Sequence, residues 1–278
     1  DIALFEVADE LSSQWAPIAA AGGAIVVDNS AAWRMAEGVP LVVPEINADA
    51  AKSPPRGIIA SPNCTTLAMV VPVNALHRRW GLRRLVAASY QAASGSGQPG
   101  IEELWDQTER AAKESDAVRS GLAGDVLDAG STFAHPIALN VIPKCGSLKE
   151  DGYTSEELKL CYETRKIMSL PDLPVTATCV RVPVVTGHGV AVHAEFSEPV
   201  DADEARMLLS AAPGVALHDD PAKDEYPTPL QAAGQDPCYV GRIRRDLFND
   251  SALEMFCVAD NLRKGAALNT VQIAELLV

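Results

Sequence analysis

Short apolar runs separated by polar or helix-like segments occupy the N-terminal part of the chain. The apolar runs cover residues 1–5, 23–27, 41–43 and 57–60, and a segment with helical periodicity covers 11–21. This alternation, with its short connections, is typical of a parallel β-sheet covered by helices. Because the first residues already show a buried-strand pattern, we expect further sequence before them in the complete fold.

The middle of the chain contains longer elements. The pattern predicts a helix at 64–80, a strand at 84–90 and a charged helix at 101–116. The segment 118–155 is rich in glycine, proline and aspartate, which predicts long loops with a short strand at 137–142. This segment is therefore the least regular part of the predicted fold.

One more helix and two strands are predicted after these loops. The helix begins at about Ser155, a good N-cap residue followed by acidic residues, and ends at about Met168. Residues 175–185 and 189–196 alternate between apolar and polar positions, which predicts paired strands with a turn at 186–189. The whole order of elements indicates an α/β protein.

Composition narrows the function classes. With 278 residues, 47% of them hydrophobic, the chain can bury a large core and is expected to form two lobes. The formal net charge is −14, from 37 acidic and 23 basic residues, so we expect no nucleic-acid or membrane partner. No apolar run reaches the ~18–20 residues of a membrane span, and no basic-then-apolar leader opens the chain. A soluble, cytoplasmic protein is therefore expected.

The six cysteines are scattered along the chain. They form no CxxC pair and have no histidine at zinc-site spacing, which predicts free thiols without disulfides and without a metal site. Cys64 differs because it lies in SPNCTT, residues 61–66, where a predicted strand ends and a helix begins. Backbone N–H groups at a helix N-terminus would favour its thiolate and could hold an oxyanion. Local features alone leave Cys64 as either a nucleophile or a small buried apolar residue.

A cysteine nucleophile needs a proton acceptor and donor, and the chain has five histidines. His188 lies between two glycines at a predicted turn, from which its ring could reach into a cleft. His193 lies in an alternating strand and is expected on a sheet face. His77 and His218 stand beside charged residues and are expected on the solvated surface, whereas the sequence assigns no place to His135.

Six separated motifs point to a known family. They are DNSAAWRM (28–35), VPEIN (43–47), SPNCTT (61–66), SYQAASGSG (89–97), CVRVPV followed by Gly187 and His188 (179–188), and DNLRKGAA (260–267). Together and in this order they resemble the aspartate-β-semialdehyde dehydrogenase family. Two related families are less similar: glyceraldehyde-3-phosphate dehydrogenase has its cysteine in an SCTTN context, and N-acetylglutamyl-phosphate reductase lacks the asparagine before the cysteine.

The resemblance implies a fold similar to that of glyceraldehyde-3-phosphate dehydrogenase. An incomplete Rossmann-type parallel-sheet lobe would precede an α+β catalytic and dimerisation lobe. Residues 1–62 would be the remainder of the nucleotide-binding domain, to which 258–278 would return, and residues 63–257 would form the catalytic and dimerisation domain. The implied assembly is a homodimer.

The resemblance also implies an activity. It is the NADP-dependent reductive dephosphorylation of L-aspartyl-4-phosphate to L-aspartate-4-semialdehyde, in the biosynthesis of lysine, methionine and threonine. The implied site residues are the catalytic Cys64, His188 and Gln91, the substrate-binding Arg181 and Glu156, the phosphate-binding Arg34, Lys159 and Asn63, and the cofactor-binding Ser94, Gly95 and Asn261.

The implied roles divide the chemistry among these residues. Cys64 would form a thioester that takes hydride from NADPH, His188 would act as acid and base, and Gln91 would orient the acyl group. Arg181 would bind the substrate's α-carboxylate through two parallel hydrogen bonds, and Glu156 would meet its amino group. Without the resemblance, Glu156 belongs to an ordinary solvated helix start, and only the apolar neighbours of Arg181 argue against a surface arginine.

The cofactor site departs from the family's pattern. The chain contains no glycine-rich turn of the GxxGxxG type, and Glu6-Val7-Ala8-Asp9-Glu10 stands where the family has Ser-Ala-Gly-Gly. Three carboxylates would repel a pyrophosphate, and the glycines that let the backbone approach it are missing. Two hypotheses follow: an NADP-dependent dehydrogenase, or a relative without normal NADP binding that acts as a non-redox acyl-transfer, hydrolytic or binding protein.

Overall fold

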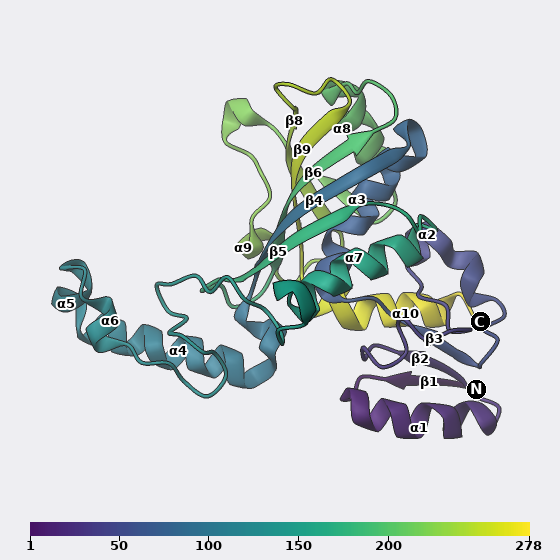
Figure 1. Ribbon diagram of the computed structural model, residues 1–278, viewed down its shortest axis with the longest axis horizontal. Coiled ribbons are helices and arrows are strands. Elements are labelled where there is room, and N and C mark those ends of the chain that lie inside the picture. Colours follow the sequence, from purple (N-terminus) through teal and green to yellow (C-terminus); the bar gives the residue numbers. More distant parts are fainter.

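The computed structural model describes all 278 residues and contains two β-sheets (Figure 1). The smaller sheet is parallel and has the order β1-β2-β3, with β1 at Ile2–Phe5, β2 at Ile25–Asp28 and β3 at Ile58–Ala60. The predicted parallel sheet is thereby confirmed. Residues 41–43 were predicted as a further strand, but they contribute only a single bridge to Ala60.

Helices cover both faces of the small sheet. Helix α1 (Asp9–Ala21) connects β1 to β2 and packs on the face that includes Val26. Val27 points to the opposite face, where the C-terminal helix α10 (Leu268–Glu275) contributes Ile273 to the same apolar cluster. The two ends of the chain therefore meet at one sheet (Figure 1). The domain limits at 62/63 and 257/258 stay predictions.

The larger sheet has six strands in the order β5-β4-β6-β9-β8-β7. Its strands are β4 (Leu82–Gln91), β5 (Val175–Arg181), β6 (His188–Phe196), β7 (Val215–Leu217), β8 (Cys238–Arg245) and β9 (Ala252–Ala259). The helices that pack against it are α3 (Cys64–Trp80), α7 (Ser155–Ile167) and α8 (Ala202–Ala211). Their shared interior is the main hydrophobic core, and the predicted helices at 64–80 and 155–168 are confirmed.

The N-cap of α7 lies one residue earlier than predicted. Thr154, and not Ser155, accepts a hydrogen bond from the backbone N–H of Glu157, whose carboxylate in turn accepts from the N–H of Thr154. This reciprocal pair satisfies two N–H groups that would otherwise lack partners. The Thr154–Glu157 spacing, three residues, is the one that a capping box requires.

Strands β5 and β6 are not hairpin partners, contrary to the sequence prediction. Strand β4 lies between them, parallel to β5 and antiparallel to β6. The connecting segment 182–187 crosses the end of β4, because the N–H of Val182 and the carbonyl of Val184 bond to the chain at residues 91–93. This crossing aligns Gln91 with Arg181 and brings His188 beside the end of β4.

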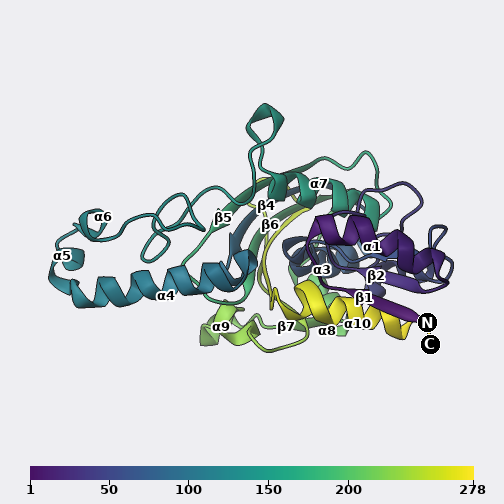
Figure 2. The ribbon, with the colours of Figure 1, turned by 90° about the horizontal axis from the view of Figure 1, so that it is seen from below.

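An arm extends away from both sheets (Figures 1 and 2). It contains α4 (Gly97–Lys113), which confirms the predicted helix, and it has a small core of its own. The short helix α5 (Ser115–Arg119) follows, and α6 (Ala123–Val126) lies within the segment that was predicted to form loops. The predicted strand at 137–142 is absent apart from one bridge at Ile142. Leu139 has a φ of 57° there, which interrupts an extended conformation.

The remaining elements are short. They are the helices α2 (Pro44–Asn47) and α9 (Pro229–Ala232), 3₁₀ turns at Ala48–Ala51, Ala93–Ser96, Glu150–Gly152 and Pro221–Lys223, and a π-helical turn at Arg263–Ala267. None of the helices has the length and apolar character that crossing a membrane requires.

Candidate active site

A cavity of about 440 Å³ lies at the carboxyl ends of strands from both sheets. Its walls come from the segments that follow β2, β3, β4 and β9 and from one face of α7. This is the edge at which α/β proteins usually bind ligands. Ten of the predicted site residues line it: Arg34, Asn63, Cys64, Gln91, Ser94, Gly95, Glu156, Lys159, Arg181 and Asn261.

Cys64 is the first residue of α3, directly after β3 and a turn, as the sequence predicted. The N-cap residue Asn63 accepts hydrogen bonds through Oδ1 from the N–H groups of Thr65, at 2.9 Å, and Thr66, at 3.3 Å. Those two groups are therefore occupied. The backbone N–H of Cys64 itself has no partner, so it is the group at this helix end that could hold an oxyanion.

The predicted thiolate at Cys64 is not favoured in this structure. Burial raises the pKa of the thiol to about 11, and the nearby Glu156 carboxylate adds to this, while Arg34 and Arg181 act in the opposite direction. The side chain of Asn63 takes up two of the N–H groups at this helix N-terminus, so those two cannot stabilise a thiolate. Cys64 therefore rests as a thiol and must lose its proton when it reacts.

His188 begins β6 and lies behind the wall of the cavity, with no exposed surface. Its Nδ1 accepts the N–H of Ala92 at 3.1 Å, and this hydrogen bond assigns the ring proton to Nε2. Nε2 has no partner in the protein. Burial, assisted by the charge of Arg181, lowers the pKa of His188 to about 3, so the ring is neutral and can donate a hydrogen bond from Nε2.

Arg181 ends β5 opposite Gln91 and is 6% exposed. Its Nη1 donates to the carbonyl of Ala92 at 2.6 Å, and its guanidinium lies over the ring of Phe133. No acidic side chain of the protein pairs with it, although burying an unpaired charge is costly. The free part of the guanidinium fits a carboxylate brought by a ligand.

One face of α7 supplies charged groups to the cavity. Glu156 accepts from Lys159 Nζ at 2.7 Å through one oxygen and from Asn63 Nδ2 at 2.9 Å through the other. Burial would raise the pKa of Glu156, but the ammonium of Lys159 and the hydrogen bonds outweigh it, and the pKa lies below its usual value. The two side chains therefore form an ion pair at the cavity wall.

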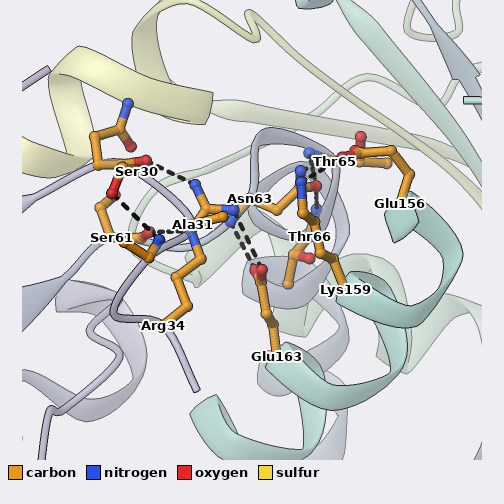
Figure 3. Close-up of polar contacts among 12 residues, drawn as sticks. Ser30, Ala31, Arg34, Ser61, Asn63, Thr65, Thr66, Glu156, Lys159 and Glu163 are labelled. Carbon is orange, nitrogen blue, oxygen red and sulfur yellow. Dashed lines mark hydrogen bonds and ion pairs between the residues drawn. The ribbon is translucent and has the colours of Figure 1, made fainter. Parts of the chain in front are cut away.

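Arg34 reaches the cavity from the loop after β2. The carboxylate of Glu163, which was not predicted as a site residue, holds it in place. Arg34 Nε donates to the carbonyl of Ser61 at 2.9 Å, Nη1 to Glu163 at 3.2 Å, and Nη2 to the carbonyl of Asn29 at 2.7 Å. Figure 3 shows Glu163 pointing from α7 toward Arg34 and Asn63. Its position seven residues after Glu156, two turns along one helix face, could have indicated it.

Ser94, Gly95 and Asn261 form another part of the wall. Ser94 Oγ accepts from Asn261 Nδ2 at 2.9 Å, and Asn261 Oδ1 accepts the N–H of Gly187 at 2.9 Å. A Cβ at Gly95 would lie 2.7 Å from Nη1 of Arg181 and 3.1 Å from the ring of His188. A side chain at this position would therefore have to displace the guanidinium of Arg181 and press on the ring of His188.

The DNLRKGAA motif also contributes, through Lys264 and Gly265, to which the sequence alone gave no role. Lys264 is 1% exposed and bonds both oxygens of Glu45 at 2.8 Å. A Cβ on the next residue, Gly265, would lie 2.8 Å from the Cβ of Cys64. The ion pair thus fixes the turn that packs directly against the cysteine.

The acidic residues at 6–10 do not all face the cavity. Asp9 lines it and accepts the N–H of Ala31 at 2.8 Å, whereas Glu6 is exposed and accepts from Asn29 at 2.7 Å. Glu10 is exposed and contributes nothing to the lining. The expectation of three repelling carboxylates at one place therefore reduces to the single carboxylate of Asp9.

Two of the other histidine predictions are wrong. His77 and His218 are half-buried rather than solvated, and His77 Nδ1 accepts the N–H of Leu82 at 2.8 Å. His193 is on a sheet face, as predicted, opposite Glu254 of β9 with 2.5 Å between Nδ1 and Oε1.

Comparison with known proteins decides the family. Residues 1–53 match the family model "Semialdehyde dehydrogenase, NAD binding domain", and residues 73–264 match "Semialdehyde dehydrogenase, dimerisation domain". The aspartate-semialdehyde dehydrogenase of Streptomyces akiyoshiensis is 50% identical over 280 residues, which cover 100% of this chain and 81% of that protein. The chain belongs to the aspartate-semialdehyde dehydrogenase family. Its relative from Aquifex aeolicus is 46% identical over 279 residues, covering 100% of this chain and 79% of the relative.

Solved structures agree with the family assignment. The crystal structure of aspartate semialdehyde dehydrogenase II from Vibrio cholerae is 42% identical, has a TM-score of 0.90, and covers 99% of this chain and 78% of that chain. The resemblance and the two-lobed α/β fold are therefore confirmed, and the chain is an oxidoreductase of amino-acid biosynthesis with a nucleotide-binding domain. The non-redox alternative is not favoured. The roles of the individual cavity residues stay predictions.

Proposed function

We propose that the protein reduces L-aspartyl-4-phosphate to L-aspartate-4-semialdehyde with NADPH, through a thioester on Cys64. The observation that carries this proposal is the content of one cavity: a cysteine at a helix N-terminus together with the unpaired guanidinium of Arg181. The guanidinium can hold the α-carboxylate of the substrate while the cysteine attacks its other end. A second Vibrio cholerae structure, 41% identical and with a TM-score of 0.91, is described as complexed with ASA.

The first step exchanges phosphate for sulfur. The sulfur of Cys64 attacks the acyl carbon, the bond between that carbon and the phosphate oxygen breaks, and the thiol proton leaves with the phosphate as HPO₄²⁻. The free N–H of Cys64 would stabilise the oxyanion that forms. Arg34 and Lys159 would bind the phosphate, and Asn63 would hold the turn beside it.

The second step reduces the thioester. Bound NADPH would supply the hydride for the acyl carbon. The oxygen electrons then re-form the carbonyl as the C–S bond breaks. Nε2–H of His188 would donate a hydrogen bond to the departing sulfur, which takes up a proton from water. Gln91, 1% exposed and bonded to Ser89, would orient the acyl oxygen during both steps.

Ser94, Gly95 and Asn261 would hold the nicotinamide end of the cofactor. Their place in the cavity beside Cys64, and the space that Gly95 leaves by having no Cβ, support this fit. NADP rather than NAD is part of the proposal, because the family resemblance implies it. A homodimer is proposed as well, supported by the match to a dimerisation domain over residues 73–264.

The test is a spectrophotometric assay in the reverse direction, with aspartate semialdehyde, inorganic phosphate and NADP⁺. We expect NADPH to form only when all three are present, NAD⁺ to be a poorer acceptor, and Cys64→Ala to be inactive. NADP⁺ reduction that does not depend on phosphate would contradict the proposal. Release of phosphate from aspartyl phosphate without oxidation of NADPH would support a hydrolytic relative instead.

A further inference from the structure

A buried carboxylate outside the expected set of site residues joins two parts of the cavity. Glu163 is 1% exposed, and its Oε1 bonds Nη1 of Arg34 at 3.2 Å. Its other oxygen, Oε2, accepts the backbone N–H of Asn63 at 2.7 Å. Both oxygens therefore bond to residues that line the cavity, although Glu163 itself does not line it.

These contacts close a ring around the turn that precedes Cys64. Arg34 bonds the carbonyl of Ser61 at one side of the turn, Glu163 bonds the N–H of Asn63 at the other, and the Arg34–Glu163 ion pair connects the two (Figure 3). The turn, the loop after β2 and helix α7 are thus fixed to one another. Each of the three segments therefore contributes to the position of the other two.

The ring also limits which donors of Arg34 can reach a ligand. A guanidinium has five N–H donors, and Arg34 uses three of them on Ser61, Glu163 and Asn29. One N–H remains on each terminal nitrogen, and Glu163 helps to fix the direction of both, because it holds the plane of the group together with the carbonyls of Ser61 and Asn29. The planar guanidinium of Arg34 needs this alignment to bind a phosphate through two N–H groups, whereas the rotatable ammonium of a lysine would not.

We propose that Glu163 is a positioning residue for the phosphate step, which aligns Arg34 with the turn that carries Cys64. This inference rests on the proposed function, because it assumes that Arg34 binds the phosphate. Glu163 acts through Arg34 and Asn63 and does not touch the substrate. Loss of its carboxylate should therefore weaken phosphate capture more than binding of the semialdehyde.

Glu157 provides a matched control on the same helix. It is also buried, at 9% exposure, and both of its oxygens accept backbone N–H groups, from Thr154 at 2.7 Å and Cys179 at 3.0 Å. It bonds no residue of the cavity lining. A merely structural carboxylate should behave as Glu157 does.

The experiment compares Glu163→Gln, Glu163→Asp and Glu157→Gln in the reverse assay, with melting temperatures for all three. We expect Glu163→Gln to raise the KM for inorganic phosphate by ~10-fold or more, with the KM for aspartate semialdehyde changed by less than ~3-fold. Glu163→Asp should fall between wild type and Glu163→Gln, because it keeps the charge on a shorter side chain. Glu157→Gln should lower the melting temperature without changing the KM for phosphate.

Equal effects of Glu163→Gln and Glu157→Gln on the phosphate KM would overturn the inference. If Glu163→Gln does not fold, Glu163→Asp must still raise the phosphate KM selectively, and an unchanged value there overturns the inference too. A wild-type protein without turnover would refute the proposed function instead. In that case the rate at which iodoacetamide alkylates Cys64, measured from the mass of its peptide, replaces the kinetics. Inorganic phosphate should slow this alkylation in wild type and in Glu157→Gln but not in Glu163→Gln. Any other pattern contradicts the role of Glu163.

Discussion

Replacing Arg181 by lysine keeps the positive charge at the end of β5 but removes the planar fork. Arg181 uses one N–H on the carbonyl of Ala92, at 2.6 Å, and has no acidic partner in the protein. A lysine could keep that contact or reach a carboxylate with a single bond, but it could not hold a carboxylate through two parallel bonds. A hydrogen bond to a charged group contributes about 1.5–3 kcal/mol, so the loss of one bond and of alignment should amount to ~1.4–4 kcal/mol.

This loss corresponds to a decrease of ~10- to 1000-fold in kcat/KM for aspartate semialdehyde. The melting temperature should change little, because the protein contacts of Arg181 are one backbone carbonyl and the ring of Phe133. An aldehyde analogue without the α-carboxylate serves as the control substrate, and the variant should use it about as well as wild type does. An equal loss for both aldehydes, or a melting temperature that falls together with activity, would refute the assignment of Arg181 to the α-carboxylate.

Three further predictions concern neighbouring parts of the site. Gly95→Ala should lower kcat with little loss of stability, because the added Cβ would lie 2.7 Å from Nη1 of Arg181 and must displace it; unchanged kinetics would show that the space is not needed. Lys264→Met should lower the free energy of unfolding, measured in urea, by ~3–5 kcal/mol, because it leaves the carboxylate of Glu45 buried without its partner; a loss below ~1 kcal/mol would contradict this. The pKa of His188 is lowered to about 3 in the folded protein, so on acidification the unfolded chain binds the proton first, and the free energy of unfolding should fall as the pH drops below about 6.5. In urea unfolding at several pH values, His188→Gln should show a shallower fall between pH ~6 and ~4. An identical slope would argue against a buried neutral ring.

Local patterns in the sequence were sufficient for several elements. The helix at Cys64–Trp80 follows from an apolar run bounded by Asn63 and Gly81, and the parallel sheet follows from alternating short strands and helices. The motifs identified the family, and ten of their predicted site residues line one cavity. These features depend on residues that are close in sequence or on a pattern that a whole family shares.

Features that depend on distant contacts were not accessible in the same way. Alternation predicted β5 and β6, but it contains no information about the insertion of β4 between them. The raised pKa of Cys64 depends on burial and on Glu156, more than ninety positions away in the chain, and not on the helix start alone. The spacing of Glu163 from Glu156 places both on one helix face, but only the fold shows that Glu163 contacts Arg34 and Asn63.

The thioester at Cys64 is the centre of the account, and it can be observed directly. The purified protein is mixed with aspartyl phosphate in the absence of NADPH, quenched in acid and digested. The mass of the peptide that contains Cys64 is then measured by mass spectrometry. We predict an added aspartyl group on this peptide in wild type, its loss on addition of NADPH before the quench, and no adduct on any cysteine in Cys64→Ala. An unmodified Cys64 peptide in a preparation that converts aspartyl phosphate to the semialdehyde, or an adduct on another cysteine, would contradict the account.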